Sequence, residues 1–441
     1  MTVLDCLRDA VSSLLRKREG DVKAAVAVRG RNERIDALVR VVREAYAEGT
    51  FCYLGGALSF FDGMSYAPVS EKDLLTVTRN VLVGMGVSPS DLRVVGSMPL
   101  DVVAERQLPP DRSHVCFSNC VLAIDGRKVM RFSPAVKVSE RLPYRYDRDA
   151  GCPEWLRFLE WALPDPGERA CLQEFCGLCY IDRDALSVEK FAILIGSGAN
   201  GKSVFCSVVS AAMGLDNVST LDPQQLSNEK MIPYVVGKRL NCAPDVKASS
   251  AFDSALKALA SGQTVTGRRI FTDAVSVKCP PIIFSLNRLP FFRDTSDGFF
   301  RRLLVFRFER TVGADRQDRS LSARIVRNEI SGVLNWILDG RDRLLSGGGA
   351  FTPSAKMERT LAEVREMASS DEEPVLTWLR KKGYETTSGE EGRKAVRISA
   401  TDIFDALGGR VSKTAISQEL ARAGVRMVRN REMYYYVYER R

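Results

Sequence analysis

Residues 191–214 read FAILIGSGANGKSVFCSVVSAAMG, and this stretch decides the fold of the middle of the chain. It begins with an apolar run typical of a buried strand and ends with an apolar, helix-like segment that stops at Gly214. Between them, residues 196–203 fit G-x-x-x-x-G-K-[ST], the phosphate-binding loop. Glycines let backbone N–H groups close around phosphates, and the N-terminus of the following helix adds a favourable dipole. The order strand, loop and helix therefore predicts a nucleotide site.

The predicted cofactors of this loop are ATP and Mg²⁺. We expect Lys202 to reach the β- and γ-phosphates and the hydroxyl of Ser203 to bind the metal ion. The residues expected to contact the nucleotide are Gly196, Ser197, Gly198, Ala199, Asn200, Gly201, Lys202, Ser203 and Val204.

The downstream sequence offers the other groups that an ATPase site needs. Asp245 follows a short strand predicted at residues 240–243 and is the candidate acid for the metal ion and the attacking water. Asn287 ends the apolar segment CPPIIFSLN, where an amide can hold that water or the γ-phosphate. Arg301 and Arg302 precede another predicted strand and are candidates for an arginine finger that reaches a neighbouring subunit's nucleotide. With Lys202, these four residues are the predicted catalytic group. Their structural alternatives are a turn aspartate, a turn asparagine and an exposed basic pair.

The wider pattern predicts an α/β protein with several parts. Apolar strands alternate with helices from residue 188 to about 310, which is typical of a parallel sheet flanked by helices. A helical segment broken at Pro164–Pro166 precedes this region, and an amphipathic helix follows it at residues 320–345. The predicted divisions are an N-terminal α+β region (1–135), a helical segment (136–187), the nucleotide-binding domain (188–345), a linker with a charged helix (346–373) and a small C-terminal domain (374–441).

Composition narrows the class of protein without naming a function. The 441 residues are 45% hydrophobic and 27% charged, with a formal net charge of +9, so a polyanionic partner such as nucleic acid is favoured but not established. No apolar run is long enough to span a bilayer, and the first residues mix acids and bases, so we expect no membrane partner and a cytoplasmic location. Zinc is possible from two cysteine pairs (Cys116 and Cys120, Cys176 and Cys179) with His114, but LQEFCGLCYI has a helical pattern that disfavours it.

The C-terminal domain has the sequence pattern of a winged helix. SATDIFDAL and VSKTAISQELARAG predict two helices, the first capped by Ser399 or Thr401, and VRMVRNREMYYYVY predicts two strands joined by a turn. A helix–turn–helix with a two-stranded wing is suited to DNA, although some such domains bind proteins. The residues expected to contact DNA here are Lys413, Arg426, Arg429 and Arg431.

The ordered set GxGxNGKS, GKRLNCAPDV, ALKALASGQTVTGRRIF, IIFSLNRLP and SDGFFRRLLVFRF resembles the superfamily 3 helicases of the phage, plasmid-island and poxvirus primase-helicase type. The resemblance covers roughly residues 110–310. It implies an AAA+-like motor that assembles as a ring, usually a hexamer, with single-stranded DNA in the pore and 3′-to-5′ movement. It also implies a DNA-contacting loop between Asp245 and Asn287, and the residues expected to contact DNA there are Lys257, Arg268, Arg269 and Lys278.

Two positions depart from the family pattern. The group usually carries a glutamate where this chain has Asp245, and often a Gly-Asp where this chain has Gly262-Gln263. The shorter acid puts the rate of hydrolysis in doubt. The region before the motor is also short for a primase domain, and the only histidine, His114, lies in a predicted hairpin, so no primase activity is expected.

The sequence therefore predicts an ATP-dependent, ring-forming DNA helicase for the replication of a phage, plasmid or genomic island. Single-stranded or forked DNA, further copies of the chain and a separate primase or initiator are the expected partners. The alternative is an ATP-switched origin-binding initiator or helicase loader with little unwinding activity. A non-replicative P-loop interaction protein is a third class.

Overall fold

The computed structural model describes residues 2–47, 50–109, 111–246, 251–252, 255–268, 274–292, 294–370, 374–386, 395–408, 411, 413–423, 425, 427–429 and 433–439. The chain forms two compact units, Met1–Asp149 and Ala150–Arg441. The first unit precedes the phosphate-binding loop, and the second contains it.

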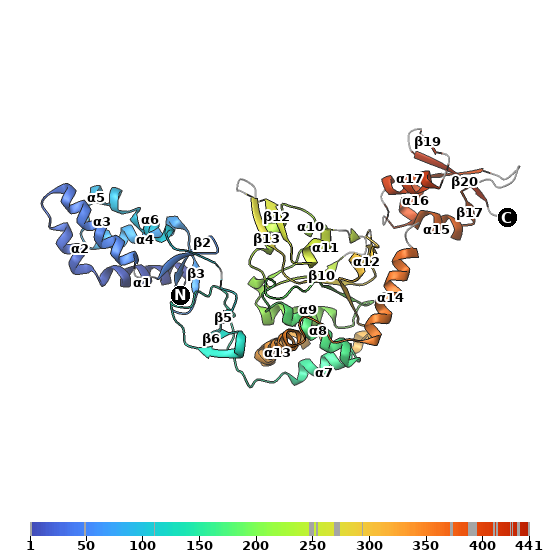
Figure 1. The fold of residues 1–441 in the computed structure, drawn as a ribbon, viewed down its shortest axis with the longest axis horizontal. Coiled ribbons are helices and arrows are strands. Elements are labelled where there is room, and N and C mark those ends of the chain that lie inside the picture. Colours follow the sequence, from blue (N-terminus) through green and yellow to red (C-terminus); the bar gives the residue numbers. More distant parts are fainter. Residues whose placement is uncertain are drawn as a thin grey trace. The chain divides into compact units, whose positions relative to one another are not determined.

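The first unit combines helices with two small sheets (Figure 1). One sheet has the order β3-β2-β1-β4, and the other is a β5-β6-β7 meander with a short turn at Asp125–Arg127. Apolar side chains of α1, such as Leu7, Val11 and Leu14, recur on one helical face and enter the core. The elements are α1 (Val3–Arg16), α2 (Glu19–Val26), α3 (Arg31–Ala47), β1 (Phe51–Leu54), β2 (Ala57–Phe61), β3 (Tyr66–Pro68), α4 (Glu71–Gly84), α5 (Pro89–Val95), α6 (Met98–Ala104), β4 (Gln107–Leu108), β5 (His114–Cys116), β6 (Val121–Ala123) and β7 (Lys128–Met130).

The second unit is built on a five-stranded parallel sheet. Its strands are β8 (Phe191–Ile195), β9 (Val218–Ser219), β10 (Leu240–Val246), β14 (Ile282–Leu286) and β16 (Leu303–Arg307), and their order is β16-β8-β14-β10-β9. The central strands are apolar at almost every position because helices cover both faces. The α/β class predicted from the sequence is therefore confirmed.

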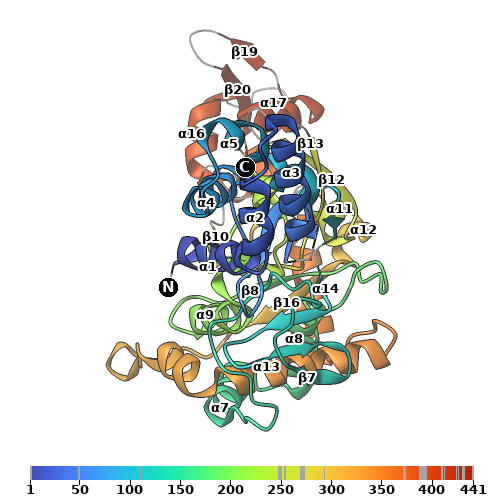
Figure 2. The ribbon, with the colours of Figure 1, turned by 90° about the vertical axis from the view of Figure 1, so that its left-hand side faces the viewer.

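Helices cover the two faces of this sheet differently. Figures 1 and 2 show α8 (Pro166–Leu178), α9 (Lys202–Met213) and α13 (Leu321–Ser346) on one side, and α7 (Pro153–Ala162) joins them there. The other face packs on α10 (Pro223–Leu226), α11 (Ala255–Ala260), α12 (Asp297–Phe300) and α14 (Ala355–Ser370). Side chains alternate along β8. Phe191 and Ile193 therefore pack on the face covered by α10, α11, α12 and α14, while Ala192 and Leu194 point to the opposite face, toward α9.

Two strand pairs lie outside the main sheet. β11 (Ala251–Phe252) pairs in parallel with β15 (Phe291–Phe292), and β12 (Thr264–Arg268) forms an antiparallel hairpin with β13 (Ala274–Lys278). This hairpin packs against the short turn Ile232–Val235. The sequence predicted basic residues here but not the hairpin itself.

The C-terminal segment has its own small core. Ser399, not Thr401, caps α16 (Ala400–Ala406), because its hydroxyl accepts from the Asp402 N–H in a capping box. α17 (Lys413–Arg422) follows, and β19 (Met427–Arg429) pairs antiparallel with β20 (Met433–Glu439), as the sequence predicted. Three further elements were not predicted from the sequence: α15 (Pro374–Lys381), β17 (Tyr384–Glu385) and β18 (Ala395–Ser399). Both of these strands pair with β20.

No helix in the described part of the chain is both long and apolar enough to cross a membrane.

Candidate nucleotide-binding site

The predicted nucleotide residues converge at one edge of the main sheet. β14 lies between β8 and β10, so the loop after β8, Asn287 after β14 and Asp245 near the end of β10 meet at the carboxyl edge. In open parallel sheets this edge is where ligands bind. A pocket of about 790 Å³ opens there, within the size range of ligand sites. Its lining residues are Glu154, Arg157, Phe158, Trp161, Gly198, Ala199, Asn200, Gly201, Lys202, Ser203, Val204, Ser207, Asp245, Asn287, Val312, Arg316, Gln317, Asp318, Arg319, Leu321 and Ser322.

The loop depends on glycine at three positions. Gly198 and Gly201 have φ values of 111° and 92°, which only glycine adopts without strain. A side chain on Gly196 would place its Cβ 2.0 Å from the Asn200 amide nitrogen and 2.4 Å from the Phe308 carbonyl oxygen. Gly201 precedes α9 and provides no capping side chain, so the first N–H groups of the helix keep their capacity to bind an anion.

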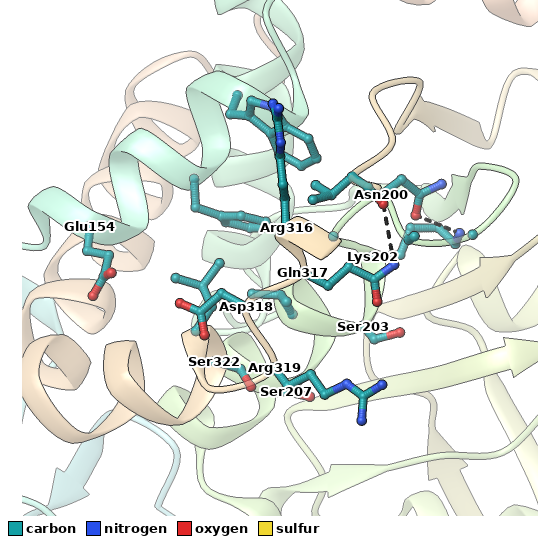
Figure 3. Close-up of a pocket in the computed structure, with 18 of the residues that line it drawn as sticks. Glu154, Asn200, Lys202, Ser203, Ser207, Arg316, Gln317, Asp318, Arg319 and Ser322 are labelled. Atoms are coloured by element: carbon teal, nitrogen blue, oxygen red, sulfur yellow. Dashed lines mark hydrogen bonds between the residues drawn. The ribbon is translucent and has the colours of Figure 1, made fainter. Parts of the chain in front are cut away.

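Lys202 is held by the loop that it follows. Its Nζ donates to the Gly196 carbonyl oxygen (2.6 Å) and to Asn200 Oδ1 (3.0 Å), and Asn200 Nδ2 donates to the Phe308 carbonyl oxygen (3.1 Å). Figure 3 shows the contact between Asn200 and Lys202. Burial lowers the pKa of Lys202, while the negative charge of Asp245 acts in the opposite direction. An ammonium group has three N–H donors, so one remains for a ligand. Asn200 therefore positions the lysine.

Asp245 occupies a bulge in its strand. The sequence predicted a strand ending at residue 243, but β10 continues to Val246, and its register with β14 shifts between Ala243 and Val246. Asp245 has a φ of 53°, in the left-handed region that few non-glycine residues adopt. Bulges re-aim side chains, and this one exposes the carboxylate to the pocket. Neither Asp245 nor Asn287 uses its side chain in a hydrogen bond or ion pair with a described residue.

The remaining walls of the pocket were not predicted from the sequence. One wall is α7, with Phe158 and Trp161. The other is the segment 312–322, called the strap below, which follows β16 and runs into the first turn of α13. Figure 3 shows the strap residues Gln317 and Asp318 between Glu154 on one side and Lys202 on the other. The helical spacing of the two aromatic residues was visible in the sequence, but only tertiary packing places them beside the loop.

Hydrogen bonds fix the strap at both ends. The Val312 N–H donates to the Ala199 carbonyl oxygen (2.9 Å). Arg324 donates from Nε (2.9 Å) and Nη2 (2.6 Å) to Glu154, and its Nη2 also donates to Asp318 (2.8 Å). Bonds from Ser320 and Arg324 lower the pKa of Asp318 to about 2, so this carboxylate is ionised at neutral pH.

Arg301 and Arg302 lie at the opposite edge of the sheet from the pocket. β16 begins at Leu303, which pairs with Phe191 at the start of β8. Arg302 donates to Ser261 Oγ (2.9 Å) and the Gly298 carbonyl oxygen (2.6 Å) and forms an ion pair with Glu189 (2.7 Å), leaving its side chain 11% exposed. Arg301 is 66% exposed and 3.4 Å from the same glutamate.

The predicted DNA-contacting residues are scattered over the second unit. Lys257 on α11 forms an ion pair with Asp294 (2.6 Å), and Lys278 at the base of the β12–β13 hairpin forms one with Asp184. Arg268 lies exposed at the other end of that hairpin. Lys413 at the start of α17 donates to Thr401 Oγ1 (2.7 Å). Arg269, Arg426 and Arg431 lie outside the described residues, as does the side chain of Arg429 on β19.

The cysteine pairs considered for zinc are buried. Cys176 lies in α8 and Cys179 immediately follows it, while Cys116 and Cys120 belong to the first unit. Within the described ranges, no three His, Cys, Asp or Glu side chains come together as a metal site.

Comparisons with known proteins give partial matches. Residues 194–302 match a family described as "Family of unknown function (DUF5906)". Over 161 residues, the chain is 29% identical to "Putative helicase L207/L206" of Acanthamoeba polyphaga mimivirus. This match covers 34% of the chain and 16% of the viral protein, so the chain spans a small part of that relative.

Solved structures of the NrS-1 C-terminal region in apo form are also similar. Two of them share 11% identity with this chain, at TM-scores of 0.46 and 0.43. Both matches cover 91% of this chain, and they cover 99% and 98% of the solved chains.

Proposed function

We propose that this protein is an ATP-dependent DNA helicase with a superfamily 3, AAA+-like motor. The observation that carries the proposal is the convergence of the phosphate-binding loop, Asp245 and Asn287 on one pocket at the carboxyl edge of a parallel sheet. The partial similarity to a mimivirus protein named as a helicase supports the same class.

The residues of the pocket fit a magnesium nucleotide. Mg²⁺ prefers oxygen ligands, and Ser203 and the unpaired carboxylate of Asp245 line the same pocket. When bound, the ion would neutralise charge that develops on the phosphates. Lys202 and the N–H groups at the start of α9 would hold the phosphates, and the Asn287 amide would orient the attacking water.

Arg301 is the better of the two arginine-finger candidates. A finger must leave its own subunit, and Arg301 is 66% exposed whereas Arg302 is 11% exposed and fully engaged. Both arginines lie at the edge of the sheet opposite their own pocket, as expected for a residue that contacts the nucleotide of a neighbouring subunit. The chain would therefore form a ring, hexameric by its family resemblance, with 3′-to-5′ movement on a strand in the central pore.

DNA would contact two basic parts of the chain. The exposed Arg268 of the β12–β13 hairpin would touch backbone phosphates in the pore, and the C-terminal segment would act as a winged helix that holds the duplex. The phosphate contacts would position DNA without reading its sequence.

The decisive test is the Lys202→Ala variant. Removing the ammonium deletes a phosphate ligand held inside the loop, so ATP turnover and unwinding of a forked duplex should fall by at least about 100-fold. Lys72→Ala, which removes an exposed lysine of α4 outside the pocket, is the matched control. Normal unwinding by the Lys202 variant would reject the motor assignment.

The second candidate function is an ATP-switched initiator or loader with little unwinding. Asp245 favours it, because an aspartate stands where the family carries a longer acid and its backbone is in a strained conformation. Measuring ATPase and unwinding on one preparation separates the two. Strong DNA-stimulated ATPase with no strand separation would favour the loader.

A further inference from the structure

The apolar part of the pocket lies beside the phosphate loop, on α7. A Cβ on Gly201 would stand 2.6 Å from Phe158 Cε2 and 3.7 Å from Trp161 Cζ3, so the two rings come against the last glycine of the loop. Phe158 is buried, with 6% of its surface exposed, whereas Trp161 is only half-buried. Trp161 therefore presents the accessible aromatic surface at this end of the pocket.

Packing on two other helices and a carboxylate cap fix the position of α7. Trp155 is fully buried and stacks on Phe205 of α9 at 5.7 Å, and its ring meets Trp336 of α13 edge-on at 5.5 Å. The carboxylate of Glu329 accepts from the N–H groups of Glu154 and Trp155 at 3.0 Å each, which satisfies the start of the helix. A rigid helix keeps Trp161 in one place relative to the loop.

The rest of the nucleotide must enter the space between α7 and the strap. Phosphates at the start of α9 fill the loop end of the pocket, and the pocket continues past Ser207, one helical turn beyond Ser203. Val312 and Leu321 of the strap also line the pocket. The two nearby acids, Glu154 and Asp318, are both engaged by Arg324, so the aromatic wall offers the free surface.

We propose that Trp161, backed by Phe158, is the stacking platform for the nucleobase of the bound nucleotide. The proposal rests on the proposed function, because it assumes a nucleoside triphosphate on the loop. A tryptophan ring binds a flat base through its π face and its large apolar area. The helical segment before the motor is then part of the nucleotide site itself.

The test separates the base from the phosphates. Binding of ATP, without hydrolysis, and of inorganic tripolyphosphate is measured by calorimetry for the wild type, Trp161→Ala, Trp161→Phe and Lys202→Ala. Loss of a base stack should weaken ATP binding by about 10- to 100-fold in Trp161→Ala, leave tripolyphosphate within about twofold, and be largely restored in Trp161→Phe. Leu156→Ala, on the exposed side of α7 and outside the pocket, should change neither ligand.

The outcomes distinguish the two proposals. If Trp161→Ala binds ATP as the wild type does, or loses affinity for ATP and tripolyphosphate equally, the stacking role of Trp161 is wrong. The proposed nucleotide site is not affected by that result. If wild type binds neither ligand, or Lys202→Ala binds both unchanged, the nucleotide site itself is wrong. A circular-dichroism melt of Trp161→Ala that matches the wild type shows that any loss is local. If the alanine variant does not fold, Trp161→Leu keeps apolar bulk without a π face and should show the same selective loss of ATP binding.

Discussion

The two ends of the main sheet use polar residues in opposite ways. At the carboxyl edge, Asp245 and Asn287 line a pocket, and neither side chain is paired with another described residue. At the amino edge, Arg302 satisfies its guanidinium with Ser261, Gly298 and Glu189. Polar residues at the two edges of one sheet therefore face an open pocket at one edge and bond to their own chain at the other.

Backbone conformation sharpens the contrast. Ala199 and Asp245 are non-glycine residues with φ values of 50° and 53°, and both line the pocket. No described residue of the amino-edge cluster adopts such a conformation. Strain of this kind costs free energy and persists where the surroundings enforce it, which is typical of functional sites.

The largest effect is expected from Asp245→Asn. The amide keeps the size of the side chain but removes the charge that would bind the metal ion and orient water, so ATP turnover should fall by about 100- to 10,000-fold. Affinity for ATP in EDTA should change little, because the phosphates bind the loop. Asp216→Asn, the same change at an exposed aspartate just before β9 at the amino edge, is the control. Steady-state ATPase assays with and without EDTA give the measurement. Wild-type turnover in Asp245→Asn would remove the residue from the catalytic group.

A smaller effect is expected from Gly196→Ala. The new methyl group would meet the Asn200 amide and the Phe308 carbonyl, so the loop must shift, at a cost of about 1–3 kcal/mol. Because Asn200 also holds Lys202, ATP affinity should fall together with the melting temperature. Gly298→Ala at the amino edge is the matched change, since its nearest neighbours would lie 3.7 Å away, an ordinary contact. Equal behaviour of the two variants in thermal melts would contradict the model of a tightly packed loop.

Local sequence patterns predicted the central elements well. The apolar run, glycines and helix pattern at residues 191–214 became β8, the loop and α9, and the break at Pro164–Pro166 became the boundary between α7 and α8. These patterns are local because strand burial, glycine conformations and proline geometry act over a few residues. The parallel sheet was predicted from the alternation of apolar strands with helices.

Other parts of the site depend on contacts between distant segments. Phe158 and Trp161 lie about 40 residues before Lys202 in sequence, and the strap lies more than 100 residues after it. Nothing in either segment resembles a nucleotide motif, and only packing of α7 on α9 and α13 brings them to the pocket. The bulge at Asp245 was missed for the same reason, since its register is set by the neighbouring strand β14.

The smallest expected effect is the difference in stability between Arg302→Ala and Arg301→Ala, two variants at the amino edge. Removing the buried guanidinium of Arg302 takes a donor from Ser261 Oγ and from the Gly298 carbonyl and leaves Glu189 with only its longer contact to Arg301, so stability should fall by about 1 kcal/mol. Removing the exposed Arg301 should leave the melting temperature unchanged, because a surface ion pair contributes little. If Arg301 serves a neighbouring nucleotide, its loss should lower ATPase only where chains assemble, so activity is compared over a range of protein concentrations. If both variants melt at the same temperature and only Arg302→Ala loses ATPase activity, the arginine finger is Arg302. The amino edge would then serve the nucleotide as the carboxyl edge does.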